Sequence, residues 1–253
     1  MYNPYSLENK TVLVTGASSG IGKATAIECA KLGATVVVTG RNEQRLDQTF
    51  KELDTSLGQQ HLSIVADLST EEGVTELVSK VPTIDGVSSN AGIPTTMLIK
   101  FIKAETLQDT WNINTASHVV LAKLLFKKKK LNQAASYVFT ASIGGTTSFG
   151  PGNSIYGMSK AAINSFMRFC AIEFATRSIR CNSVSPGMIM TPMTQDSTTF
   201  TKEDYEKDAE NYLLKRYGRP EEVARTIVFL LSDASSFITG QTIIVDGGFS
   251  ANH

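Results

Sequence analysis

"TGASSGIG", at residues 15–22, follows the short apolar run "TVLV" and opens a helical stretch. Its glycines, Gly16, Gly20 and Gly22, permit a tight turn and let the backbone approach a pyrophosphate at the N-terminus of the following helix. A Walker-type phosphate loop would need glycine at Ala17 and serine or threonine at Ala24, which this sequence lacks. A structural turn without a ligand stays open, but the strand–turn–helix context favours a dinucleotide site.

The chain around this loop alternates between two kinds of segment. Short runs rich in β-branched residues and apolar on both faces occupy 11–16, 35–40, 62–67, 86–92, 136–142, 179–187 and 242–248. Helical stretches lie between them at 20–32, 42–57, 70–80, 104–130, 154–176 and 220–232. Such β-then-α units predict one α/β domain over 1–253, of Rossmann type: a doubly wound, mainly parallel seven-stranded sheet with helices on both faces.

One polar segment breaks this alternation. Residues 191–217 are threonine-rich and then acidic, and they follow the carboxyl end of a predicted strand. A long insert at that place is typical of a loop that covers a bound molecule. We therefore expect 191–217 to form a substrate lid within the single domain.

The composition excludes several classes of protein. Lysine plus arginine equals aspartate plus glutamate, at 24 each, which argues against a nucleic-acid-binding protein. No apolar run is long enough to span a membrane, and the N-terminus has no apolar signal segment. Three widely spaced cysteines without a CxxC motif indicate free thiols and a cytoplasmic location. The histidines show no metal-ligand spacing, so no metal site is expected; they are His61, His118 and His253.

The end of the second predicted strand bears on the choice of dinucleotide. An NAD site places an acid there, where it accepts a hydrogen bond from the ribose 2′-hydroxyl. This strand ends instead in Gly40, followed by Arg41, whose guanidinium is able to bind a phosphate with two hydrogen bonds. Ser19 and Asn42 could add further hydrogen bonds. The sequence therefore favours NADP(H) over NAD(H), with a merely solvated Arg41 as the alternative.

"SIYGMSKAA", at residues 154–162, places Tyr156 and Lys160 four positions apart on a predicted helix. They therefore share one face of the helix. An ammonium beside a phenol, whose free pKa is about 10, would together with the positive ring of an oxidised nicotinamide lower that pKa and suit the phenol to proton transfer. The alternative is a surface helix on which the tyrosine ring covers the lysine stem.

The motifs together resemble those of the short-chain dehydrogenase/reductase family, along nearly the whole chain and in its compact branch. The matching pieces are "TGASSGIG", "ADL" (66–68), "NAG" (90–92), Asn114 in "INTAS", Ser142 in "TASIGG", "YGMSK" (156–160), "IRCNSVSPGMIMTPM" (179–193) and "GRPEEVARTIVFLLSDASSFITGQTIIVDGG" (218–248). The resemblance implies a catalytic set of Asn114, Ser142, Tyr156 and Lys160. Asn112 competes with Asn114, whose context "NTAS" is the better match.

The resemblance also implies where the cofactor would bind. With the residues already discussed, the expected cofactor-binding set is Gly16, Ser18, Ser19, Gly20, Ile21, Gly22, Gly40, Arg41, Asn42, Asp67, Leu68, Asn90, Ala91, Gly92, Tyr156, Lys160, Pro186, Gly187, Ile189 and Thr191. Two positions depart from the family pattern. Ser89 stands where the family usually has a first asparagine before "NAG", and Ala141 stands where a second serine is common.

These observations predict an NADP(H)-dependent oxidoreductase that interconverts a ketone and a secondary alcohol, with Tyr156 as general acid and base. A 3-oxoacyl thioester is the leading substrate. The alternatives are an NAD-linked sugar, polyol or steroid alcohol dehydrogenase and a non-catalytic nucleotide-binding protein. Helices 104–126 and 154–176 are apolar on more than one side, which predicts a homotetramer; the residues concerned include Val119, Leu124, Phe166 and Phe169.

Overall fold

The computed structural model describes residues 2–195 and 201–252, so His253 and residues 196–200 of the expected lid lie outside the described part. The described residues form one seven-stranded sheet in the order β3-β2-β1-β4-β5-β6-β7, with parallel pairing between all neighbours. The predicted fold class is confirmed. The strands are β1 (Thr11–Thr15), β2 (Thr35–Gly40), β3 (Leu62–Val65), β4 (Ile84–Ser89), β5 (Leu131–Thr140), β6 (Arg180–Pro186) and β7 (Thr242–Val245).

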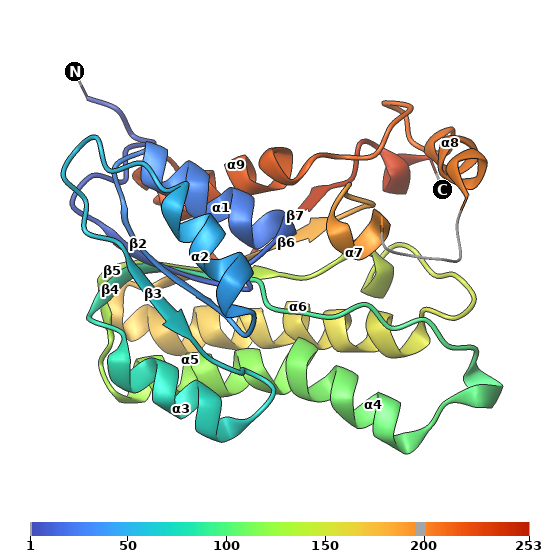
Figure 1. The fold of residues 1–253 in the computed structure, drawn as a ribbon, viewed down its shortest axis with the longest axis horizontal. Helices are drawn as coiled ribbons and strands as arrows, with labels where there is room; N and C mark the ends of the chain where they lie inside the picture. Colours follow the sequence, from blue (N-terminus) through green and yellow to red (C-terminus); the bar gives the residue numbers. More distant parts are fainter. Residues whose placement is uncertain (1, 196–200, 253) are drawn as a thin grey trace.

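Helices cover both faces of the sheet (Figure 1). One face carries α1 (Gly20–Lys31), α2 (Glu43–Lys51) and α9 (Pro220–Leu231). The opposite face carries α3 (Glu71–Lys80), α4 (Ala104–Trp111), α5 (Ser117–Lys127) and α6 (Ser154–Phe174). Two short helices, α7 (Pro192–Gln195) and α8 (Lys202–Ala209), lie apart from both layers, near the C-terminus.

The alternation of side chains along β1 shows why this sequence forms a sheet between two layers. Val12 and Val14 pack into the hydrophobic core under α1 and α9, whereas Leu13 packs into the second core on the other face. All three side chains are fully buried. Burying each contributes roughly 1.5–3 kcal/mol relative to an exposed position, so a strand apolar on both faces is stable only inside such a sandwich.

Several predicted boundaries were wrong; the helix expected at 42–57, for example, ends at Lys51. The single helix expected at 104–130 is two helices, α4 and α5, joined by a π-helical turn at Asn112–Ala116. β5 starts at Leu131 rather than at 136, and its register against β4 shifts between Ile84 and Gly86. Ala134 there has φ of 61°, which is typical of an extra residue in a bulge. This first part of the strand was not predicted because its sequence, "LNQ", is largely polar and does not read as a buried strand.

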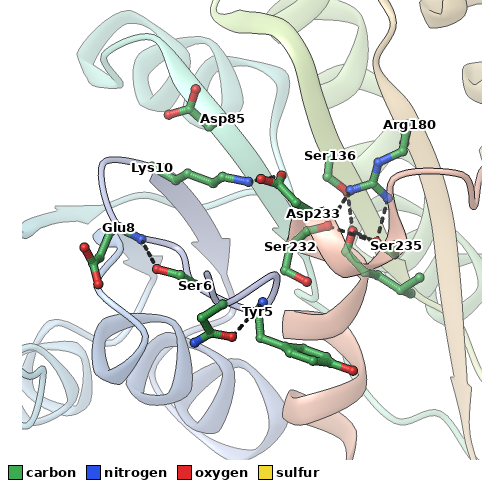
Figure 2. Close-up of polar contacts among 12 residues, drawn as sticks. Tyr5, Ser6, Glu8, Lys10, Asp85, Ser136, Arg180, Ser232, Asp233 and Ser235 are labelled. Atoms are coloured by element: carbon green, nitrogen blue, oxygen red, sulfur yellow. Dashed lines mark hydrogen bonds and ion pairs between the residues drawn. The ribbon is translucent and has the colours of Figure 1, made fainter. Parts of the chain in front are cut away.

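The amino-terminal edge of the sheet is held together by polar contacts (Figure 2). Lys10, just before β1, forms an ion pair with Asp233 at 2.5 Å. Arg180, the first residue of β6, donates to Ser235 Oγ at 2.9 Å and to the Ser232 carbonyl at 3.1 Å. Asp85 accepts from the backbone N–H of Thr11 at 2.8 Å. These contacts lie at the edge of the sheet opposite to the glycine loop, because that loop follows the carboxyl end of β1. Within the described residues, no helix is long and apolar enough to cross a membrane.

Candidate active site

The glycine loop between β1 and α1 adopts a conformation that requires glycine. Gly16 and Gly20 have φ of 63° and 54°, in the left-handed region that other residues rarely adopt. A Cβ at Gly22 would lie 2.3 Å from the Gly16 carbonyl oxygen. The N-cap residue Ser19 makes no side-chain capping bond, so it leaves the first N–H groups of α1 free of a side-chain acceptor. This end of α1 therefore fits a pyrophosphate.

The end of β4 lies directly against this loop. Thr15 Oγ1 accepts hydrogen bonds from the backbone N–H groups of Asn90, at 2.9 Å, and Ala91, at 3.1 Å. A Cβ at Gly20 would lie 3.2 Å from the Thr191 side chain. The structure therefore brings residues expected to bind the cofactor from three distant segments to the same place.

The end of β2 carries the residues expected to select the dinucleotide. Gly40 is buried beside Ser18, whose Oγ would lie 3.3 Å from a Cβ at position 40. Arg41 is exposed. Hydrogen bonds from Ser69 lower the pKa of the Asp67 carboxyl, and the charge of Arg41 lowers it further. Arg41 and Asp67 thus lie close enough to interact across the carboxyl ends of β2 and β3.

Other polar groups near this edge are already engaged. Asn42 Oδ1 caps α2 by accepting from the backbone N–H of Arg45 at 2.9 Å. Lys23, a cation on α1, is bound to Glu52 at 2.7 Å. Leu68 is buried. Arg41 follows Gly40 directly in the chain, and its exposed guanidinium is therefore the cation best placed to meet a ligand at the end of β2.

Lys160 and Asn114 form the buried centre of the second cluster. Lys160 is only 3% exposed, and its Nζ donates to the Thr140 carbonyl at 3.0 Å. A Cβ at Gly92 would lie 3.2 Å from Lys160 Nζ and 3.3 Å from Asn114 Oδ1. Glycine at 92 therefore keeps open a space that is bordered by the ammonium and the amide.

Ser142 and Tyr156 complete the cluster. Ser142 follows β5, and its Oγ accepts from the backbone N–H of Gly144 at 3.1 Å. A side-chain hydrogen bond with Ser142 lowers the pKa of Tyr156, but burial raises that pKa more. All four residues of the expected catalytic set therefore lie around the carboxyl end of β5 and the start of α6.

Burial has the largest effect on the pKa values of Tyr156 and Lys160. Lys160 Nζ lies over the Tyr156 ring, 5.9 Å from its centroid, and its hydrogen bond goes to Thr140. Within the chain itself, burial raises the pKa of Tyr156 more than the hydrogen bond with Ser142 lowers it. The expected lowering, which rests on Lys160 together with an oxidised nicotinamide ring, stays a prediction. Burial lowers the pKa of Lys160 from 10.5 to about 8.

Asn114 lies in the π-helical turn, and its side chain is fully buried. Its Oδ1 accepts from the backbone N–H of Ile93 at 2.8 Å, and its Nδ2 donates to the Ile93 carbonyl at 3.0 Å. Asn112, the competing residue, accepts instead from the exposed Gln108. Of the two asparagines, the structure places Asn114 beside Gly92 and Lys160.

The segment after β6 lies opposite the glycine loop. β6 ends at Pro186, and Gly187 N donates to Val245 O at 3.1 Å. Ile189 is buried in the core under α1 and α9, so its side chain serves packing. Thr191 is the residue of this group that reaches Gly20.

The described part of the lid is fastened to its surroundings by tyrosines. Tyr205 donates to the Thr194 carbonyl, and Tyr212 accepts from the backbone N–H of Met188 at 3.1 Å. Tyr217 donates to Asp208 at 2.6 Å. These bonds keep α8 and the following residues next to the 188–194 segment.

A groove with a volume of about 550 Å³ adjoins the catalytic cluster. Gly144 and Gly145, just after Ser142, and Gly157, next to Tyr156, line one side. Most of the remaining surface is apolar and includes Leu98, Ile99, Phe149, Pro151 and Met158.

One residue with a direct bond to the expected cofactor groove was missed in the sequence. His118 is buried, and its Nε2 lies 2.9 Å from the Ala91 carbonyl oxygen. The available signal was its position four residues after Asn114, which places both side chains on the same face of a helix. Within the described residues, no group of three or more histidine, cysteine, aspartate or glutamate side chains is arranged to hold a metal ion.

Comparisons with known proteins agree with this geometry. The family model described as enoyl-(acyl carrier protein) reductase matches residues 16–250. The 3-oxoacyl-[acyl-carrier-protein] reductase of Rickettsia felis is 36% identical over 96% of this chain and 97% of its own length. The L-xylulose reductase of Caenorhabditis elegans is 35% identical over 98% of both chains. A short-chain type dehydrogenase/reductase from Mycobacterium marinum superposes with a TM-score of 0.88 at 31% identity, over 97% of both chains. The chain therefore belongs to the short-chain dehydrogenase/reductase family of oxidoreductases, and within it resembles the 3-oxoacyl-[acyl-carrier-protein] reductases.

Proposed function

We propose that this protein is an NADP(H)-dependent oxidoreductase that reduces a ketone to a secondary alcohol, or runs the reverse reaction. The observation that carries the proposal is the meeting of Ser142, Tyr156 and Lys160 at the carboxyl end of β5, next to a glycine loop that fits a pyrophosphate. A binding module would need the loop but not the hydroxyl and phenol beside a buried ammonium. This argues against the non-catalytic alternative.

The bound nicotinamide would supply the hydride to the carbonyl carbon of the substrate. Ser142 would donate a hydrogen bond to the carbonyl oxygen, and Tyr156 would give that oxygen its phenolic proton. In the reverse direction Tyr156 would take the proton from the alcohol. Lys160, whose pKa of about 8 lies near neutrality, would place positive charge beside the phenol as its proton leaves. Asn114 would hold the 92–93 segment in place through Ile93 and is proposed to bind a water that relays protons to Lys160.

The preference for NADP(H) is proposed from Gly40 and Arg41. An exposed guanidinium after the end of β2 suits a ribose 2′-phosphate, and the strand offers no carboxylate at position 40 for a 2′-hydroxyl. The Asp67 carboxylate lies near Arg41 and competes with a phosphate for the positive charge of its guanidinium. NAD(H) is therefore the alternative cofactor.

The proposed substrate is a 3-oxoacyl thioester. An apolar groove beside Ser142 and Tyr156 suits an acyl chain better than a polyhydroxylated sugar, because burying sugar hydroxyls without partners costs free energy. The second candidate is a sugar ketone, which is favoured by the likeness to an L-xylulose reductase over 98% of the chain.

Three further features belong to this proposal. Residues 191–217 would act as a lid within a single domain, because the tyrosine contacts keep their described part against the 188–194 segment. A homotetramer is proposed from apolar side chains left exposed on α4 and α6, among them Trp111, Phe169 and Ile172. A cytoplasmic location is proposed because all three cysteines are free and buried.

The deciding experiment is an assay of NADPH and NADH oxidation against a panel of 3-oxoacyl thioesters, sugar ketones and steroid ketones. We expect activity with 3-oxoacyl thioesters and NADPH. Activity confined to sugar ketones would favour the second candidate. No turnover with any ketone, despite cofactor binding, would support the non-catalytic alternative.

A further inference from the structure

The segment 90–93 forms the floor between the glycine loop and the catalytic cluster. Thr15 Oγ1 accepts from the N–H groups of Asn90 and Ala91. Asn114 holds both the N–H and the carbonyl of Ile93. The carbonyl of Ala91 is held by a third element, α5, through His118. Gly92 is therefore held in place through hydrogen bonds of the residues before and after it, Ala91 and Ile93.

His118 is bound at both ring nitrogens. Nε2 lies 2.9 Å from the Ala91 carbonyl oxygen, and Nδ1 lies 2.7 Å from Ser89 Oγ. A carbonyl oxygen only accepts, so Nε2 must carry the hydrogen of the neutral ring. Nδ1 then accepts, and the Ser89 hydroxyl donates to it. The Ala91 carbonyl thereby fixes the tautomer, and the bond from Ser89 to Nδ1 holds the ring in the orientation in which it reaches Ala91.

The pair is closed to solvent and insensitive to pH. Ser89 and His118 are each 1% exposed. Burial and then the charge of Lys160 lower the pKa of His118 to about 3, so the ring stays neutral near neutral pH. A ring with this pKa, whose two nitrogens are both occupied, is unsuited to act as an acid or base in the reaction.

We propose that His118, oriented by Ser89, is a positioning residue for the cofactor: it holds the Ala91 carbonyl and so keeps Gly92 at its distance from Lys160 and Asn114. This inference rests on the proposed function, because it assigns the 90–93 segment to the cofactor groove. The tolerance is narrow. A Cβ at Gly92 would already be 3.2 Å from Lys160 Nζ, so a shift of the segment by a few tenths of an ångström changes the space between them.

Ser89 also stands where the family pattern has an asparagine. An asparagine side chain is likewise able to donate a hydrogen to His118 Nδ1. Ser89→Asn should therefore preserve the bond to Nδ1 that orients the ring, whereas Ser89→Ala should remove it. This difference gives a matched set of variants at one position.

The test measures the dissociation constants of NADPH and NADH by fluorescence, together with kcat, KM and the unfolding temperature. His118→Phe keeps a ring beside Phe139 but removes both hydrogen bonds. We expect it to weaken NADPH binding by about tenfold or more, equivalent to about 1.4 kcal/mol, with a smaller change in kcat. His118→Gln offers an amide donor to Ala91 and an acceptor to Ser89, and should bind NADPH within about threefold of the wild type.

The matched control is Ser136→Ala. Ser136 is buried, and its hydroxyl donates to the Leu230 carbonyl at 2.7 Å, at the amino-terminal edge of the sheet (Figure 2). This variant removes a comparable bond far from the groove, so it should lower the unfolding temperature without changing NADPH binding. If His118→Phe behaves in the same way, His118 is structural only and the inference is overturned.

Two further readouts keep the inference testable if His118→Phe does not fold. Nitrogen-15 NMR of the imidazole should show the Nε2–H tautomer with a hydrogen-bonded Nδ1 in the wild type and in Ser89→Asn, and an Nδ1 signal shifted by loss of that bond in Ser89→Ala. NADPH binding should weaken in Ser89→Ala and recover in Ser89→Asn. Unchanged NADPH binding in Ser89→Ala, despite loss of the bond at Nδ1, would overturn the inference alone. A wild type that binds neither NADPH nor NADH would overturn the proposed function and this inference with it.

Discussion

The ammonium of Lys160 lies 5.9 Å from the centroid of the Tyr156 ring, and its hydrogen bond goes to the carbonyl of Thr140. The lysine therefore supports the tyrosine from the side of the ring, while Ser142 supplies the side-chain hydrogen bond that lowers the pKa of the phenol. This division of roles between Ser142 and Lys160 has a physical consequence in the proposed mechanism. Ser142 and a substrate oxygen share the hydroxyl end of Tyr156, whereas Lys160 acts on it through space.

Tyr156→Phe keeps the ring over Lys160 and removes the transferable proton. We expect turnover to fall below about a tenth of the wild-type value, a loss of more than about 1.4 kcal/mol, while NADPH binding is retained. Steady-state kinetics and fluorescence titration measure the two quantities. Retention of most of kcat would show that another group protonates the substrate.

The pH dependence of stability tests the burial of Lys160. Because its pKa falls from 10.5 to about 8 on folding, the unfolded chain binds more protons than the folded chain between these values. The contribution of Lys160 to the free energy of unfolding therefore rises with pH across this window, by about 3 kcal/mol. Below about pH 8 the ammonium is charged in both states, and its burial is destabilising.

Buried thiols act in the opposite direction. Burial raises the pKa of each cysteine above the ordinary 9.0, to about 12 for Cys170, so their contribution falls as pH rises above about 9. The pH dependence of the total free energy of unfolding therefore does not by itself report on Lys160. We expect the free energy of unfolding of the wild type minus that of Lys160→Met, measured with urea, to increase between pH 8 and 10.5. A constant difference would show that Lys160 does not lose its proton in the folded state.

The parallel sheet and the layers follow from the sequence because the strand segments are rich in β-branched residues and alternate with helical stretches, the first of which is opened by a glycine loop. The boundaries do not follow where backbone geometry overrides composition. The turn at Asn112–Ala116 and the bulge around Ala134 each add residues that change no hydrophobic pattern. Neither leaves a signal in a search for periodicity.

The candidate site was predictable where a side chain belongs to a motif. Asn114 and Lys160 both lie beside Gly92, and Lys160 lies over the ring of Tyr156, as their motifs imply. The Ser89–His118 pair was not predicted, because its partners are 29 residues apart in the chain and meet only when β4 packs against α5. Sequence spacing also does not reveal the burial of Tyr156, which raises its pKa more than the hydrogen bond of Ser142 lowers it.

Phe149 tests the assignment of the groove to an acyl chain. Its side chain is 81% exposed at the groove and should lose that exposure against a long acyl chain. We expect Phe149→Ser to raise KM for long-chain 3-oxoacyl thioesters by about fivefold or more, with little effect on short-chain ones. Phe237→Ser, which changes an exposed aromatic at another place, is the control. Equal effects on both chain lengths would remove the groove from the substrate site.

The exposed apolar residues of α6 test the proposed assembly. Leu124 and Phe166, expected at an interface, pack instead in or against the core, whereas Phe169 and Ile172 are 59% and 71% exposed. We expect light scattering to give four times the protomer mass of 27.4 kDa, and Ile172→Glu to reduce it. Leu57→Glu, an exposed leucine outside the helices, should leave the mass unchanged. A wild-type monomer at micromolar concentration would end the proposal.

The cofactor preference depends on two adjacent residues at the end of β2. A charge-assisted pair of hydrogen bonds from Arg41 to a phosphate contributes roughly 1.5–3 kcal/mol, but exposure to solvent reduces such a contribution. We therefore expect the wild type to prefer NADPH over NADH by at least about fivefold in kcat/KM. Gly40→Asp combined with Arg41→Ala should reverse the preference, because the carboxylate repels the 2′-phosphate and accepts from the ribose hydroxyl.

A control variant separates the effect of a negative charge at position 40 from the effect of the added side-chain volume. A Cβ at position 40 would lie 3.3 Å from Ser18 Oγ and 3.4 Å from its Cβ, so any side chain there requires Ser18 to move slightly. Gly40→Ala introduces the same contact without charge and should leave the preference for NADPH in place while weakening both cofactors alike. If Gly40→Ala alone removes the preference, the discrimination comes from the fit at Ser18. If the wild type uses both cofactors equally, or the double change has no effect, Arg41 is only a solvated residue before α2.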